Sequence, residues 1–153
     1  MKKILFSTVV LAMSLSANAQ CPEYKVVQAP QVDLAQYETD GKGYQQIFNG
    51  KDFTGWRGYG KDHVPARWEV EDGCLKFNGS GTGEGQTAEG GDIIFAHQYK
   101  NFTLEFEWKV AKGSNSGVFI LGQEVTTKDE KGNDRYEPIF ISSPEYQILD
   151  NAN

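Results

Sequence analysis

The residues best suited to chemistry lie in the segment EYQILD, near the end of the sequence. In a strand, alternate side chains point to opposite faces, so Glu145 and Gln147 would share one face. A carboxylate such as Glu145 or Asp150 can act as a general base. An amide such as Gln147 can both donate hydrogen bonds to hydroxyl groups and accept them. The segment therefore suits the floor of a groove that binds a sugar.

The same pattern also fits an ordinary strand of a half-buried sheet. In that interpretation Glu145 and Gln147 face solvent, while Tyr146 and Ile148 face the layer between two sheets. A groove requires that the sheet bend, so that its polar face becomes hollow. The residues by themselves leave this choice open.

Two other segments could contribute to the same groove. Asn115 and Ser116 precede the apolar run of SGVFIL, and Trp56 closes the segment FNGKDFTGW. The polar pair could line the rim, and the indole ring could pack against a sugar ring. Both segments also fit ordinary turns, with Trp56 as a packing anchor.

Other chemistries have weaker support. The two histidines, His63 and His97, are not accompanied by a G-x-S-x-G serine, so a catalytic triad is hard to build. Cys21 and Cys74 show no zinc-binding spacing. The string GEGQTA lacks the following helix of a dinucleotide site. A divalent metal near the carboxylates is conceivable, although no spacing specifies one.

The elements that would position these residues follow a β pattern. WEVEDGCLKF predicts a hairpin that turns at Asp72-Gly73, because both central positions of a type I′ turn need positive φ. This register places Trp68 opposite Phe77 and Glu69 opposite Lys76. Shorter strands are expected in the segments YQQIF, DIIF, SGVFIL, PIFI and EYQIL.

The strongest strand signal is NFTLEFEWKV, residues 101–110, where apolar and polar residues alternate without a break. No long amphipathic helix is indicated anywhere. Short strands, frequent glycines and period-two alternation predict an all-β chain that forms a β-sandwich or jelly roll. A glycine-rich flexible loop is expected over residues 78–91, and a solvated hairpin tip in TTKDEKGNDRYE.

The N-terminus has the order of a secretory signal. Two lysines precede an apolar stretch, and small residues end at Ala19. We therefore predict a signal peptide over residues 1–19, an extended leader over 20–43 with one helical turn in VDLAQY, and a domain over 44–153. Asn18 and Gln20 do not fit a lipoprotein signal at Cys21. The protein is expected to be periplasmic or extracellular, without membrane insertion.

The charge balance excludes some partners. The sequence has 21 acidic and 15 basic side chains and a net charge of −6 at pH 7. Removal of the signal peptide would take away two lysines and make the charge more negative. Such a surface repels nucleic acid and anionic lipid, so neither is an expected partner.

An ordered series of segments resembles a known family. IFNGKDFTGW, WEVEDGCLKF, NFTLEFEWKV, SNSGVFIL and EYQILDN, in this order, are similar to the bacterial 3-keto-disaccharide hydrolase domain, also described as a 3-keto-glucoside 1,2-lyase and 3-keto-2-hydroxyglucal hydratase. The resemblance covers residues 44–153. It implies a concanavalin A-like jelly roll in an exported, carbohydrate-active enzyme with a small 3-keto-glycoside as substrate.

The resemblance also implies roles for individual residues. Glu145 and Asp150 match the family's E-x-Q-x-x-D strand, with Glu145 as the base or a metal ligand and Asp150 orienting a partner. Gln147 would hold sugar hydroxyls, and Asn115 and Ser116 match the family's NSG segment at the groove. Trp56 would complete the substrate-binding set.

Family members continue beyond the DN motif into further strands and a segment with histidine and aspartate. The resemblance therefore implies an incomplete jelly roll in this chain, a fragment that is expected to be inactive alone, and a candidate general base in the further segment. Two other functions stay open: a non-catalytic carbohydrate-binding module on the same scaffold, and a conventional glycoside hydrolase.

Overall fold

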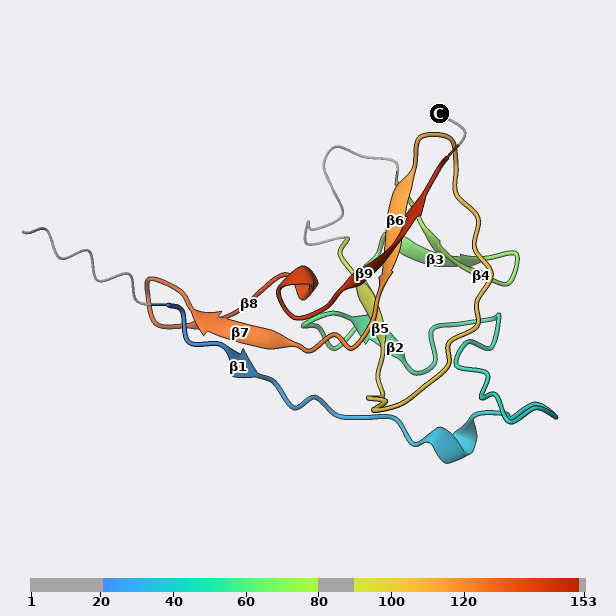
Figure 1. The fold of residues 1–153 in the computed structure, drawn as a ribbon, viewed down its shortest axis with the longest axis horizontal. Helices are drawn as coiled ribbons and strands as arrows, with labels where there is room; N and C mark the ends of the chain where they lie inside the picture. Colours follow the sequence, from blue (N-terminus) through green and yellow to red (C-terminus); the bar gives the residue numbers. More distant parts are fainter. Residues whose placement is uncertain (1–20, 80–89, 152–153) are drawn as a thin grey trace, which may run out of the picture.

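The computed structural model describes residues 21–79 and 90–151, and this part of the chain is all-β. Its strands form four small sheets, with the orders β1-β7-β8, β2-β5, β3-β4 and β6-β9 (Figure 1). The strands are β1 (Lys25–Val26), β2 (Trp56–Gly58), β3 (Trp68–Glu71), β4 (Cys74–Phe77), β5 (Ile93–Phe95), β6 (Asn115–Phe119), β7 (Val125–Lys128), β8 (Asp134–Tyr136) and β9 (Glu145–Leu149). The predicted fold class is thus confirmed as all-β, and the jelly-roll topology stays a prediction. The predicted signal peptide and most of the glycine-rich loop lie outside the described residues.

The hairpin of β3 and β4 forms with the predicted register. Trp68 pairs with Phe77 and Glu69 with Lys76. The turn residues Asp72 and Gly73 have φ angles of 51° and 72°, as a type I′ turn requires. The rings of Trp68 and Phe77 lie 5.2 Å apart, and Lys76 Nζ lies 3.2 Å from Glu69 Oε1. Turn chemistry and alternation together therefore determined this element.

The strand expected over residues 101–110 was the main error, because no strand forms there in the structure. Figure 1 shows this segment within the long trace, yellow to orange, that connects β5 to β6. A strand is stabilised by ladder hydrogen bonds to a neighbour, and none of the described strands pairs with this segment. Its apolar row is exposed by 39–50%; the residues are Phe102, Leu104, Phe106 and Trp108.

Two shorter predictions were also wrong. The segment YQQIF contributes only an isolated bridge, between Gln45 and Thr39. The segment PIFI forms the 3-10 helix η2 (Ile139–Ile141), which begins after Pro138 and buries Ile139. Runs this short do not distinguish a strand from a single helical turn by periodicity.

The leader contributes to the fold over part of its length. Residues Lys25 and Val26 form β1, which pairs antiparallel with β7. The expected helical turn is present as the 3-10 helix η1 (Leu34–Gln36), whose first turn is capped by Asp33. The opposite edge of β7 pairs with β8, and the loop between them is the predicted exposed hairpin tip.

An aromatic cluster joins β2 and β5 to the leader. The ring of Phe95 lies 5.1 Å from that of Tyr37 and 5.7 Å from that of Trp56. The ring of His97 lies 4.8 Å from that of Tyr99 and its Nδ1 lies 3.2 Å from the carbonyl oxygen of Val32, so this histidine packs against the leader. Among the described residues the buried apolar side chains are few: Val125, Ile139, Ile148 and Pro65.

Candidate functional site

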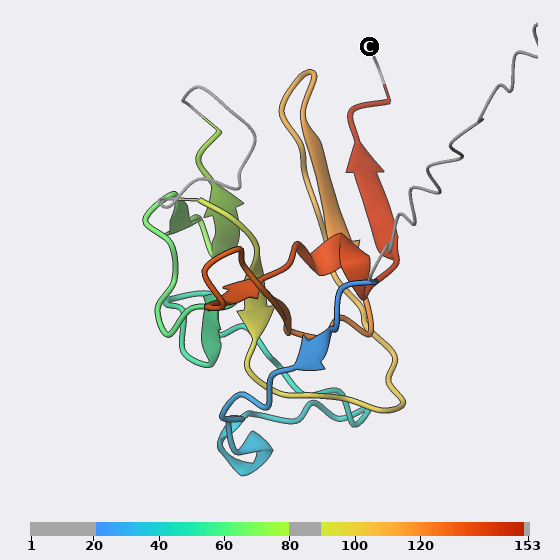
Figure 2. The same cartoon turned by 90° about the vertical axis from the view of Figure 1, so that its left-hand side faces the viewer.

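The strand pair β6–β9 brings most of the predicted site residues together. The two strands are antiparallel and lie side by side in both views (Figure 1 and Figure 2). Gly117 pairs with Gln147, and Phe119 pairs with Glu145. Because paired residues share a face, Asn115 and Gly117 lie on the same face as Glu145 and Gln147. The segments NSG and E-x-Q, separated in sequence, therefore build one surface.

The amide of Gln147 is held by β6. Its Nε2 donates a hydrogen bond to the side-chain oxygen of Asn115 and another, at 2.9 Å, to the carbonyl of Ser116. Asn115 and Gln147 are both exposed. The contact leaves the Gln147 oxygen and the Asn115 NH₂ group for further hydrogen bonds, so the pair presents one acceptor and two donors toward solvent.

The carboxylate of Glu145 has a different environment. Its side chain is exposed, and no hydrogen bond or ion pair reaches it from the part of the chain that the structure describes. It lies across β6 above Gly117: a Cβ atom built on this glycine would be 2.6 Å from both Cγ and Cδ of Glu145. A carboxylate without competing partners is available to accept a proton from a bound molecule.

Ser116 and Asp150 have described contacts with the β6–β9 pair or with the turn before it, and their roles at a site stay predictions. Ser116 pairs with Ile148, so its side chain faces away from Glu145 and only its carbonyl contacts Gln147. The Asp150 Oδ2 atom accepts a hydrogen bond from the Gly113 N–H at 2.8 Å. The Asp150 N–H donates to the Ser114 carbonyl at 3.2 Å. Asp150 thus stabilises the turn that precedes β6.

Trp56 lies in a different sheet from these residues. Its indole N–H donates to the Ile47 carbonyl at 2.7 Å, and its ring packs against Phe95. Asn49 fixes the preceding turn through a 2.8 Å hydrogen bond from the Lys51 N–H to its side chain. The described contacts of Trp56 are those of a packing anchor, and its substrate-binding role stays a prediction.

The expectation that Tyr146 and Ile148 both face a buried layer holds for only one of them. Ile148 is 6% exposed, but Tyr146 is 60% exposed. The Tyr146 ring meets the Phe106 ring edge-on at 6.4 Å, and Phe106 is itself exposed. The alternation of β9 is therefore correct, whereas the covering layer is incomplete over the described residues.

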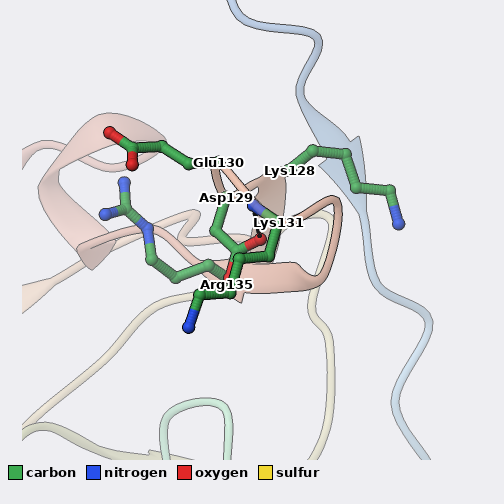
Figure 3. Close-up of a pocket in the computed structure, with 5 residues that line it drawn as sticks. All are labelled: Lys128, Asp129, Glu130, Lys131 and Arg135. Carbon is green, nitrogen blue, oxygen red and sulfur yellow. Dashed lines mark hydrogen bonds between the residues drawn. The ribbon is translucent and has the colours of Figure 1, made fainter.

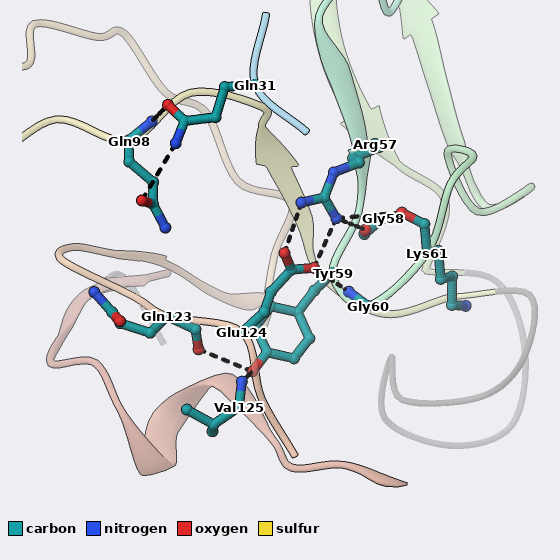
Figure 4. Close-up of polar contacts among 10 residues, drawn as sticks. All are labelled: Gln31, Arg57, Gly58, Tyr59, Gly60, Lys61, Gln98, Gln123, Glu124 and Val125. Atoms are coloured by element: carbon teal, nitrogen blue, oxygen red, sulfur yellow. Dashed lines mark hydrogen bonds and ion pairs between the residues drawn. The ribbon is translucent and has the colours of Figure 1, made fainter. Parts of the chain in front are cut away.

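A partly buried ion pair was missed by sequence reasoning. Arg57 in β2 binds both carboxylate oxygens of Glu124 at 2.6 Å, and Gly60 N donates to Glu124 Oε1 at 2.7 Å (Figure 4). Tyr59 adds a hydrogen bond to the Gln123 carbonyl at 3.1 Å. The contact fixes the segment before β7 to β2. No sequence signal could have found it, because 67 positions separate the two charged residues.

The environment of Glu124 lowers the pKa of its carboxyl group. Burial acts to raise the pKa of its carboxyl group, but hydrogen bonds from Arg57 and from the Gly60 N–H, together with the Arg57 charge, outweigh burial and lower it. The pKa of Arg57 is raised, mainly by its hydrogen bonds to the Glu124 carboxylate. Both groups are therefore charged at neutral pH, and they form a structural contact rather than a proton-transfer pair.

Two open hollows lie away from β6 and β9. One, of about 390 Å³, is lined by charged side chains at the β7–β8 tip (Figure 3): Lys128, Asp129, Glu130, Lys131 and Arg135. The other, of about 440 Å³, lies beside the contact of β1 with β7 and is lined by Lys25, Val26, Val27, Gln28, Thr126, Asp134 and Tyr136. Neither lining contains a predicted site residue, so a groove at Glu145 stays a prediction.

Within residues 21–79 and 90–151, no group of three His, Cys, Asp or Glu residues could hold a metal ion. Within the same ranges, no helix has the length and apolar character needed to span a membrane.

Comparisons with known proteins agree with the resemblance of the ordered segments. A family model described as the 3-keto-alpha-glucoside-1,2-lyase-like domain matches residues 43–153. A 3-keto-disaccharide hydrolase of Bacteroides thetaiotaomicron is 61% identical over 139 residues, which cover 90% of this chain and 48% of that protein. The chain thus spans about half the length of this curated relative. Since the family model matches well over half of the chain, the chain belongs to the 3-keto-alpha-glucoside-1,2-lyase-like domain family.

Proposed function

We propose that this chain is part of an exported enzyme that cleaves 3-keto-glycosides to a 3-keto sugar and a free alcohol. The observation that supports it best is the shared face of β6 and β9, which carries an unpaired carboxylate, Glu145, next to the amide pair of Gln147 and Asn115. Family membership and the similarity to a 3-keto-disaccharide hydrolase support the same substrate class. The signal-like order of residues 1–19 supports export.

The proposed reaction uses the acidity that a ketone gives to a neighbouring C–H bond. A C3 ketone acidifies the hydrogen on C2, and a general base removes that proton to leave an enolate. The enolate electrons then form the C1–C2 double bond, while the C1–O bond breaks and the leaving oxygen gains a proton. Water adds across the double bond, its OH to C1 and its hydrogen to C2. The net reaction is hydrolysis without an oxocarbenium-like centre.

The residues of the β6–β9 pair have different roles in the proposed reaction. Glu145 is the general base for the C2 proton, because its carboxylate is exposed and free of partners among the described residues. The Gln147 oxygen and the Asn115 NH₂ group bind sugar hydroxyls and orient C2 toward the base. Asp150 acts indirectly: by holding the turn at Gly113 it fixes the start of β6, where Asn115 lies.

The decisive experiment supplies the full-length protein with a 3-keto-disaccharide and with its unoxidised parent. Sugar released from each is measured for wild type and for Glu145→Gln. We expect turnover of the 3-keto substrate alone, and loss of at least about 10²-fold in kcat/KM in the variant. Substrate affinity should persist, because glutamine preserves the shape of the side chain. Glu130→Gln makes the same chemical change at the exposed β7–β8 tip and should leave activity unchanged.

The other outcomes are distinct. Sugar binding without turnover of any 3-keto substrate by wild type would identify a carbohydrate-binding module. Equal cleavage of the unoxidised disaccharide would identify a conventional glycosidase. Full activity in Glu145→Gln would assign the base to another residue. Each of these results contradicts the proposal at a different step.

A further inference from the structure

We propose that Gly117 is a positioning residue for Glu145, because its missing side chain leaves the space in which the carboxylate lies. This inference rests on the proposed function, in which Glu145 is the base. Gly117 is the third residue of β6 and pairs with Gln147. Glu145 precedes Gln147 by two positions on β9, so it lies diagonally across the ladder from Gly117.

The geometry of this diagonal contact is tight. A Cβ atom at position 117 would be 2.6 Å from Cγ and from Cδ of Glu145, and closer still to Oε1. Carbon atoms in contact normally lie about 3.5–4.0 Å apart, so the two groups cannot occupy this space together. Any side chain at position 117 would therefore displace the Glu145 carboxylate from its place over β6.

The backbone gives no competing reason for glycine at this position. Gly117 is not among the glycines with positive φ, and it lies within a regular antiparallel strand, where alanine is compatible. The group that an added Cβ meets is the end of a flexible, exposed side chain rather than backbone. Glu145 can therefore swing aside without disturbing the ladder. The expected effect of Gly117→Ala is on the position of the carboxylate, with the fold retained.

The test compares kcat and KM of full-length variants on a 3-keto-disaccharide. We expect Gly117→Ala to lower kcat on the order of 10- to 100-fold, the effect of a base displaced by about an ångström. KM should change less than about twofold, because Gln147 and Asn115 are untouched, and the melting temperature should match that of wild type. Gly41→Ala is the matched control, since a Cβ there meets no described atom within 4 Å, and it should leave both constants unchanged.

A second background separates positioning from structure. Alanine at position 145 lacks the Cγ and Cδ atoms that an added Cβ at position 117 would meet. Glu145→Ala will lower activity by itself, and adding Gly117→Ala to it should lower activity no further. A purely structural role for Gly117 would instead reduce kcat by the same factor in both backgrounds and would lower the melting temperature.

The outcomes also separate this inference from the proposed function. If Glu145→Gln is inactive while Gly117→Ala keeps the wild-type kcat, the positioning role is refuted and the base assignment stands. If Glu145→Gln is fully active, the base assignment itself fails, and with it the reason for positioning. Equal losses from Gly117→Ala in both backgrounds overturn the positioning role alone.

Discussion

At the scale of single residues, the pair of Arg57 and Glu124 is the least exposed ion pair in the described structure. The Glu124 side chain is 8% exposed and that of Arg57 is 16% exposed, so solvent screens the pair weakly. Arg57 Nη1 also donates to the carbonyls of Gly58 and Lys61, each at 3.2 Å. These hydrogen bonds to the guanidinium group offset the free-energy cost of partly removing the two charges from water. The pair therefore joins two sheets that are distant in sequence.

The pair gives folding stability a defined pH dependence. The folded pKa of Glu124 lies below its unfolded value of about 4.3, so its stabilisation is complete above that pH and is lost as pH falls through the folded pKa. We expect Glu124→Gln to lower the free energy of unfolding by about 3 kcal/mol at pH 7, because it leaves Arg57 unpaired. Urea titrations of wild type and Glu124→Gln from pH 7 to pH 3 measure the difference in unfolding free energy, which should decrease as the pH falls.

The matched control for this experiment is Glu130→Gln. Glu130 is exposed at the β7–β8 tip, so the same loss of charge there should change the unfolding free energy by less than about 0.5 kcal/mol. A difference between Glu124→Gln and wild type that stays constant down to pH 3 would contradict the assigned ionisation. Equal stability of the two proteins at pH 7 would show that the ion pair contributes nothing to folding.

At the scale of elements, the β3–β4 hairpin and residues 101–110 show when a local sequence pattern is enough to form a strand. The β3–β4 hairpin contains its own partner strand and its own turn, so Asp72-Gly73 and the alternation suffice to form it. Residues 101–110 have stronger alternation but need an edge from elsewhere. No described strand supplies that edge, and the apolar row from Phe102 to Trp108 stays exposed.

This exposed row predicts self-association of the isolated chain. Burying a large apolar side chain contributes about 1.5–3 kcal/mol, and adjacent exposed rows from two copies can bury one another. We expect sedimentation velocity to show dimers or larger species that increase with protein concentration. The triple variant Leu104→Thr, Phe106→Thr, Trp108→Thr replaces these side chains with smaller, polar, β-branched ones that still favour an extended backbone, and it should shift the chain toward monomer.

The control replaces charged neighbours on the other face of the same segment. Glu107→Thr with Lys109→Thr leaves both the net charge and the apolar row unchanged, so association should persist. A wild-type chain that sediments as a monomer at every concentration would refute the association. Equal association of the triple variant would place the contact elsewhere on the surface.

At the scale of the whole molecule, the chain covers about half of its curated relative and carries a net negative charge. The acidic balance disfavours nucleic acid and anionic membranes and leaves a small neutral sugar as a compatible ligand. The leader is tied to the domain through β1 and through the hydrogen bond from Val32 N–H to the Ala96 carbonyl at 2.7 Å. A mature protein that begins at Gln20 would keep these contacts.

The proposed export gives a direct prediction. Signal cleavage after Ala19 should yield a mature N-terminus at Gln20, because the A-x-A site follows a charged and then an apolar stretch. N-terminal sequencing of the protein from the periplasmic or extracellular fraction measures this. Ala19→Arg blocks the small-residue site and should leave the precursor uncleaved. Recovery of the chain in the cytosol with its first lysines intact would contradict export.

Features that depend on neighbouring residues could be predicted from the sequence. Alternation predicted β9 and the shared face of Glu145 and Gln147, and Asp-Gly predicted the hairpin register to the residue. The contacts between distant segments became visible only in the folded chain: Gly117 with Glu145, and Arg57 with Glu124. The tertiary structure also decided that residues 101–110 lack a partner among the described strands. The physical reason is that periodicity and turn chemistry act through the local backbone, whereas close contacts between strands depend on how the chain brings remote segments together.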